Sequence, residues 1–153
     1  VYMFNTSIRN NICMNKEIDD KIVMEVCENS GLSDFISEVS LDYVVGQNGA
    51  MLSGGQKQKI ALARALVQNS PIVIFDEATS NTDVYSEQQI NGLLHTKLKE
   101  KTVIIITHKQ EILREADQII LLKDGIVIGT GRYDDLIKSN VDFKDMINMA
   151  ERY

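Results

Sequence analysis

Two short apolar runs, each followed by polar side chains, constrain the fold of this chain most. The first covers residues 72–75 and is followed by Asp76 and Glu77. The second covers residues 103–106 and leads to His108. Continuous apolar runs of this length are typical of strands buried on both faces of a parallel sheet. Because helical patterns alternate with these runs, the sequence predicts an α/β fold with a parallel sheet.

The remaining elements follow from the spacing of apolar residues. Helices are expected where these residues recur at helical intervals, over residues 18–28, 32–39, 55–67, 84–98, 110–116, 132–138 and 143–150. Strands are expected over residues 72–75, 102–107 and 119–122, with a hairpin turn at 123–125 leading into 126–128. Residues 5–11 are polar and predict a turn. Ser33 is the expected N-cap of the helix over residues 32–39. The helix over residues 55–67 has apolar residues on all sides, which predicts that it is buried.

Composition limits the classes of function. The 153 residues fit one domain and carry a net charge of -6, with no cluster of five or more lysines and arginines. This charge argues against a large nucleic-acid interface. No apolar run approaches the ~20 residues of a membrane-spanning helix. Cys13 and Cys27 lack the spacing of a metal site, so we expect reduced thiols.

Residues 53–56 have the composition of a phosphate-binding turn. Glycines let the backbone approach a ligand closely. The first N–H groups of the following helix and the Ser53 hydroxyl are donors that suit a phosphate, and the helix dipole adds partial positive charge. Taken alone, the same stretch is also compatible with an ordinary helix N-cap beside two turn glycines. The candidate ligands are Ser53, Gly54, Gly55 and Gln56.

Two carboxylates at a strand end are the second candidate site. One of the pair, Asp76 and Glu77, suits magnesium coordination, and the other suits activation of a water molecule. His108 follows a neighbouring strand, and parallel strands end at the same edge of a sheet, so it is expected beside the carboxylates. A solvated loop junction and a structural histidine are the alternatives for these residues alone. Asp83 is compatible with a simple helix-start residue.

The order and spacing of these residues together resemble the ATP-binding cassette (ABC) ATPases over essentially the whole chain. Residues 52–56 read L-S-G-G-Q and are similar to the signature motif of that family, and residues 72–76 look like its Walker B strand. Residues 3–12, 45–49 and 129–136 are similar to segments of exporter-type cassettes, with Tyr133 in a position that is His in the family pattern. Gln47 replaces the usual Glu, and Lys57 and Lys59 replace frequent arginines.

The resemblance implies a role for each candidate residue. Glu77 would be the catalytic glutamate, His108 the switch histidine, and Asp83 the end of the D-loop that couples two sites. Asp76 would hold Mg²⁺. The signature residues Ser53, Gly54, Gly55 and Gln56 would touch the γ-phosphate of an ATP held by a second nucleotide-binding domain.

The family also implies partners and a location. These are a head-to-tail dimer of nucleotide-binding domains, the transmembrane domain of an exporter, no nucleic acid, and the cytoplasmic face of the cell membrane. Within the chain, the resemblance divides residues 1–153 into a helical subdomain with the signature motif (1–68) and part of the α/β core (69–153).

No G-x-x-x-x-G-K-[ST] loop occurs in residues 1–153. By the spacing of the family, the chain would begin just past the Q-loop and form the C-terminal part of a P-loop NTPase domain. We therefore expect the isolated chain to be inactive and, with incomplete sheet edges, prone to self-association. Two alternatives remain at this point: the C-terminal lobe of a chromosome-maintenance ATPase of the SMC type, and an interaction module that does not hydrolyse ATP.

Overall fold

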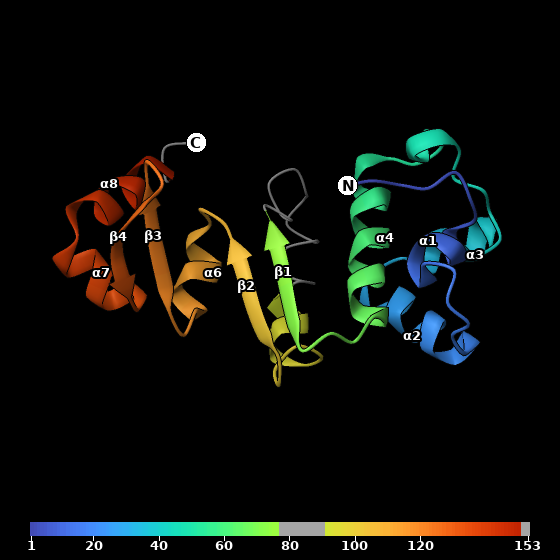
Figure 1. Ribbon diagram of the computed structural model, residues 1–153, viewed down its shortest axis with the longest axis horizontal. Helices are drawn as coiled ribbons and strands as arrows, with labels where there is room; N and C mark the ends of the chain where they lie inside the picture. The colour runs from blue at the N-terminus through green and yellow to red at the C-terminus, as the bar shows by residue number, and fades with distance from the viewer. Residues whose placement is uncertain (77–90, 151–153) are drawn as a thin grey trace. The chain divides into compact units, whose positions relative to one another are not determined.

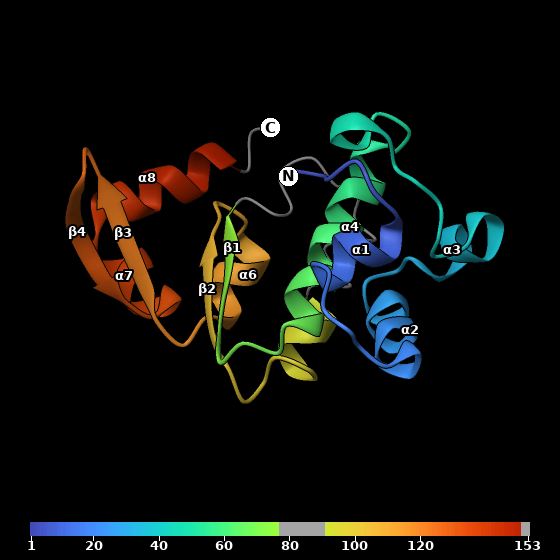
Figure 2. The same ribbon diagram turned by 45° about the vertical axis from the view of Figure 1, so that its right-hand side comes forward.

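The computed structural model describes residues 1–76 and 91–150, which fall in two compact units, Val1–Ile105 and Ile106–Tyr153. The first unit contains α1 (Ile8–Cys13), α2 (Asp20–Asn29), α3 (Ser33–Val39), the 3-10 turn η1 (Gln47–Gly49), α4 (Gly54–Val67), β1 (Ile72–Asp76) and β2 (Thr102–Ile106), at whose end the second unit begins. The second contains α6 (Gln110–Glu115), β3 (Ile119–Lys123), β4 (Ile126–Gly131), α7 (Tyr133–Ser139) and α8 (Val141–Ala150) (Figures 1 and 2).

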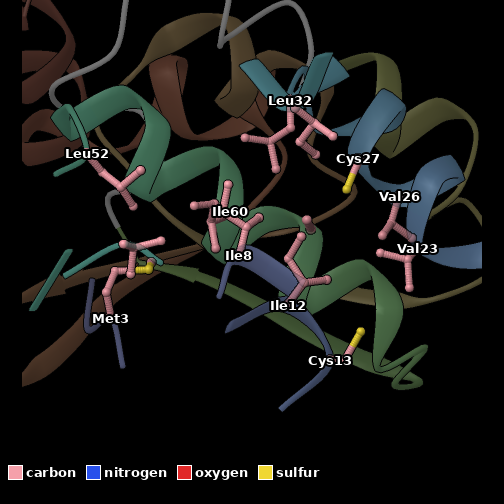
Figure 3. Packing of buried hydrophobic residues seen from close by; sticks show 13 residues of the cluster. Met3, Ile8, Ile12, Cys13, Val23, Val26, Cys27, Leu32, Leu52 and Ile60 are labelled. Carbon is pink, nitrogen blue, oxygen red and sulfur yellow. The ribbon is translucent and has the colours of Figure 1, made fainter. Parts of the chain in front are cut away.

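Helices α1, α2 and α4 pack side by side and enclose the main core of the first unit. Its buried apolar side chains come from these three helices, from Ile36 of α3, and from the segments before and between the helices (Figure 3). Ile8, Ile12, Val23 and Ile60 are fully buried within it. The buried pairs Ile8 and Ile12, Val23 and Cys27, and Ile60 and Ala63 lie three or four positions apart, so each helix presents one apolar stripe to the core. This confirms the helices predicted over 18–28 and 55–67.

The first helix is a feature that the sequence pattern missed. Residues 5–11 were expected to form a turn, but α1 begins after Ser7, whose side chain accepts a hydrogen bond from the Asn10 N–H (3.2 Å). Ile8 and Ile12 form its buried stripe, although only polar residues separate them. Asn11 is also buried, and its side chain bonds the backbone N–H and carbonyl of Phe4 (2.9 and 3.0 Å). These two hydrogen bonds pair the buried Asn11 amide with the backbone N–H and carbonyl of Phe4, so neither group is left unsatisfied.

Arg64 joins α4 to this first segment. Its Nε donates to the Asn11 carbonyl (2.7 Å), and its Nη1 donates to the Tyr2 carbonyl (3.2 Å). Its guanidinium also lies 5.9 Å from the centroid of the Phe4 ring. Burial lowers the pKa of Arg64 from its ordinary value. A guanidinium that bonds two carbonyls more than fifty residues away in sequence fixes the segment against the helix.

Strands β1 and β2 are hydrogen-bonded neighbours that run in the same direction (Figure 1). Val73 and Phe75 are buried with Leu93 and Leu98 on one face of β1. Ile74, on the other face, is 62% exposed. The prediction of strands buried on both faces is therefore wrong for the residues described, because their apolar contacts gather on one face only.

The third predicted strand does not extend this parallel sheet in the parts of the chain that the structure describes. Instead, β3 pairs with β4 in an antiparallel hairpin closed by Asp124 and Gly125. Both turn residues have positive φ (52° and 78°), which matches the right-handed twist of two-residue hairpins. The predicted hairpin turn is thereby confirmed. Helices α7 and α8 pack together with this hairpin around the fully buried Phe143.

Other boundaries differ in detail from the sequence prediction. The N-cap of α3 is Leu32 rather than Ser33, and it makes no side-chain cap hydrogen bond. Helix α4 is only partly buried: Ile60 and Ala63 are buried, and most of its other side chains are half-buried. Of the helix predicted over 84–98, residues 84–90 lie outside the described residues, residues 91–95 are helical, and residues 96–98 form turns, so the predicted end at 98 is wrong. The division of the chain at residue 68 stays a prediction.

Both cysteines are free and buried, in agreement with the expected thiols. Burial raises the pKa of the Cys27 thiol to about 11, so it stays protonated near neutral pH. Across residues 1–76 and 91–150, no helix has the length and apolar character needed to cross a bilayer.

The exposed face of β1 leads to a first testable prediction, which concerns self-association of the chain. Ile74→Thr should reduce self-association of the chain at micromolar concentration with little loss of stability, because it replaces an ethyl group of an exposed side chain with a hydroxyl. The matched control is Val73→Thr, one residue away on the buried face, which should lower the free energy of unfolding by about 1–3 kcal/mol. Sedimentation velocity and urea denaturation measure the two effects. Equal self-association of the parent chain and Ile74→Thr would contradict this role of the exposed face.

Candidate functional site

The candidate phosphate-binding turn is the capped N-terminus of α4. The backbone N–H of Gln56 donates to Ser53 Oγ (3.2 Å), and the backbone N–H of Ser53 donates to Gln56 Oε1 (2.8 Å). This reciprocal pair is a capping box, which fixes the turn without help from a ligand. In it, Ser53 Oγ serves as an acceptor, so its hydroxyl proton remains for donation to another oxygen.

Gly54 and Gly55 leave the mouth of this turn open. Both are exposed, and a Cβ built on either would meet no atom within 4 Å among the residues described. Helix α4 is 14 residues long and has no acidic side chain in its first turn. Its first N–H groups therefore present partial positive charge that no carboxylate on that turn neutralises. This arrangement is suited to an oxygen-rich anion such as a phosphate.

The loop before the turn depends on glycine at Gly49. Its φ is +67°, and an added Cβ would lie 2.9 Å from Met3 Cγ and 3.0 Å from Lys57 Cε. The Leu52 N–H donates to the Gly49 carbonyl (3.0 Å), which brings the chain into the signature turn. A glycine is required here both by conformation and by the close approach of Met3 and Lys57.

Asp76 is the last residue of β1, and its side chain is exposed. It therefore lies at the edge of the sheet where β1 and its parallel neighbour β2 end. Such an edge is where ligands bind in open α/β sheets. The partner carboxylate, Glu77, and the D-loop candidate, Asp83, lie outside the described residues. Within residues 1–76 and 91–150, no group of three or more potential metal ligands occurs.

His108 is exposed and lies in the turn between β2 and α6. The turn is closed locally, since the Lys109 N–H donates to Thr107 Oγ1 (3.1 Å). The proximity of His108 to the carboxylates at the end of β1 stays a prediction. His95 is exposed in the helical residues 91–95.

Comparison with known proteins identifies the class. The family model described as ABC transporter matches residues 2–80, more than half of the chain. The chain is 38% identical to the ATP-dependent lipid A-core flippase of Pseudoalteromonas translucida, covering 97% of this chain and 26% of that protein. It is equally identical, over 90% of its length, to the flippase of the same name from Escherichia coli K12, of which it covers 24%.

A solved structure agrees with this result. A bacterial Atm1-family ABC exporter with ATP bound superposes with a TM-score of 0.90 at 32% identity, over 97% of this chain and 27% of that one. The chain belongs to the ABC transporter family. It spans about a quarter of the length of the curated relatives it matches. The chromosome-maintenance alternative is not supported, because these matches are to transporters.

Proposed function

We propose that this chain is the C-terminal part of the nucleotide-binding domain of an ABC exporter and takes part in ATP hydrolysis there. The observation that carries the proposal is the open, capped turn at Ser53 to Gln56, where a helix N-terminus and two exposed glycines face outward. The names of the relatives, an ATP-dependent flippase and an ATP-bound exporter, support it. The complete protein would act at the cytoplasmic face of a membrane, with a transmembrane domain as its partner.

In this proposal two domains form a head-to-tail dimer. The signature turn would bind the γ-phosphate of an ATP held by the P-loop of the second domain, with Ser53 donating its hydroxyl proton and the first N–H groups of α4 adding donors. These donors neutralise the charge that spreads over the phosphoryl oxygens in the transition state. Asp83 would couple the two sites across the interface.

The residues at the sheet edge would serve the ATP bound in cis. Asp76 would hold Mg²⁺, since a single exposed carboxylate together with phosphate oxygens suits the way this ion binds in nucleotide sites. The ion would supply charge neutralisation on the phosphates. Glu77 would accept a proton from the attacking water, and His108 would contact the γ-phosphate.

The two exposed glycines offer a test in which stability and activity move in opposite directions. Gly55→Ala should leave the free energy of unfolding unchanged or raise it by up to about 1 kcal/mol, because the new Cβ meets open space in a helix. In the complete transporter the same Cβ would lie where phosphate approaches. The ATPase rate should fall about 10–100-fold, the equivalent of one lost charge-assisted hydrogen bond.

Gly92→Ala is the matched control for this experiment. Gly92 is also helical, and its added Cβ likewise meets no atom of the described residues within 4 Å. It should raise stability similarly and leave ATP turnover unchanged. Full turnover by Gly55→Ala would refute the proposed contact. A complete protein with no ATPase activity at all would favour the interaction module instead.

A further inference from the structure

Tyr133 is a buried tyrosine that the nucleotide-binding motifs do not account for. It is the first residue of α7 and is 6% exposed. Its ring packs edge-on against Phe143, with the ring centroids 5.5 Å apart. The guanidinium of Arg114, from α6, lies over the same ring at 4.4 Å from the centroid. The ring is therefore held from two sides, which fixes the direction of its hydroxyl.

The Tyr133 hydroxyl binds the beginning of α6. It donates to Gln110 Oε1 (3.0 Å), and Arg114 Nη2 donates to the same oxygen (3.2 Å). Two donors on one amide oxygen use both of its lone pairs and fix the rotamer of Gln110. The three side chains form a closed network, because Arg114 contacts both the ring of Tyr133 and the amide that its hydroxyl binds.

This network holds the helix that directly follows His108. Gln110 is the first residue of α6 and lies two positions after the histidine. Helix α6 has only six residues, and its N-cap, Lys109, makes no side-chain cap hydrogen bond. Such a short helix depends on contacts with its surroundings for its position. On the other side of His108, the bond from the Lys109 N–H to Thr107 Oγ1 closes the turn.

We propose that Tyr133 acts through Gln110 as a positioning residue for His108. The inference rests on the proposed function, in which His108 contacts the γ-phosphate. The tyrosine hydroxyl keeps the start of α6 in one place, and this fixes where the preceding turn presents the imidazole. Tyr133 stands where the family pattern that the chain resembles has a histidine.

The test compares Tyr133→Phe with the parent sequence in the complete transporter. Phenylalanine keeps the ring against Phe143 and Arg114 and removes only the hydroxyl. We expect kcat for ATP hydrolysis to fall about tenfold at unchanged KM, since small misplacements of a catalytic group have effects of this order. Gln110→Leu should cause a similar fall, and the double variant should fall no further. Tyr2→Phe, which removes an exposed tyrosine hydroxyl, should leave kcat unchanged.

A background of His108→Ala separates positioning from general damage. With no imidazole to position, Tyr133→Phe should leave the residual rate unchanged, whereas a loss of folded protein would lower it by the same factor as before. An unchanged kcat in Tyr133→Phe, an additive double variant, or an equal loss in the His108→Ala background would each overturn the inference. Gly55→Ala reports on the proposed function independently: if it keeps full turnover, the function fails, and if only the Tyr133 result fails, the function stands.

Discussion

Replacing Glu77 with Gln in the complete transporter should lower the rate of ATP hydrolysis about 10²–10⁴-fold while ATP binding is retained. Glu77 follows Asp76 directly at the end of β1, where the proposed function requires a group that accepts a proton from water. The amide of glutamine has nearly the same shape but does not act as a base at neutral pH. The change therefore removes the proton transfer and leaves the contacts that bind nucleotide.

Phosphate release measures the rate of ATP hydrolysis, and equilibrium binding of labelled ATP measures the affinity for nucleotide. Glu28→Gln is the matched control, because it makes the same chemical change at an exposed position near the end of α2. It should alter neither rate nor binding. Near-normal turnover by Glu77→Gln would remove this glutamate from the mechanism, whereas loss of ATP binding would mean that its role is in the binding of substrate.

Arg64→Ala should lower the free energy of unfolding of the first unit by about 2–4 kcal/mol. Arg64 donates charge-assisted hydrogen bonds to the carbonyls of Asn11 and Tyr2, and each such bond contributes about 1.5–3 kcal/mol. Alanine leaves the Asn11 carbonyl without this donor and removes the guanidinium that lies over the Phe4 ring. The segment before α1 should then separate from α4.

Urea denaturation followed by circular dichroism at 222 nm measures this loss, with Ile74→Thr as the background to limit self-association. Arg64→Lys should recover part of the stability, because an ammonium keeps the charge but not the fork that reaches two carbonyls. Arg132→Ala, which removes an exposed partner of Asp117, should change stability by no more than about 0.5 kcal/mol. If the two alanine variants were equally stable, Arg64 would not hold the segment.

The sequence predicted the elements whose apolar residues keep a regular period. Helix α2, strands β1 and β2 and the hairpin at Asp124 were found in this way, because local spacing reflects local structure. Helix α1 was missed because its buried stripe includes the polar Asn11, whose burial depends on partners at Phe4 and Ser7. Burial on both faces of β1 was overestimated, because an apolar run does not show which neighbours cover it.

Of the candidate site, the sequence predicted the turn at the signature motif, but it did not predict the contacts between distant residues. Ser53 and Gln56 lie in the turn that was expected, and the residues at 77 and 83 fall outside the described structure. The contacts of Arg64, which joins α4 to the first segment, and of Tyr133, the proposed positioning residue, were not predicted. Their partners lie across the fold at Asn11 and Gln110, and a single sequence carries no local signal for such contacts.

The capping box at Ser53 and Gln56 affects the association rate of the two nucleotide-binding domains in the proposed dimer. Because the turn is already closed by its own hydrogen bonds, its conformational entropy is lost when the domain folds and not when the partner arrives. At this turn, the encounter then resembles the docking of a preformed surface. The association rate of the proposed dimer should therefore be set by diffusion, orientation and the charges that face each other across the gap.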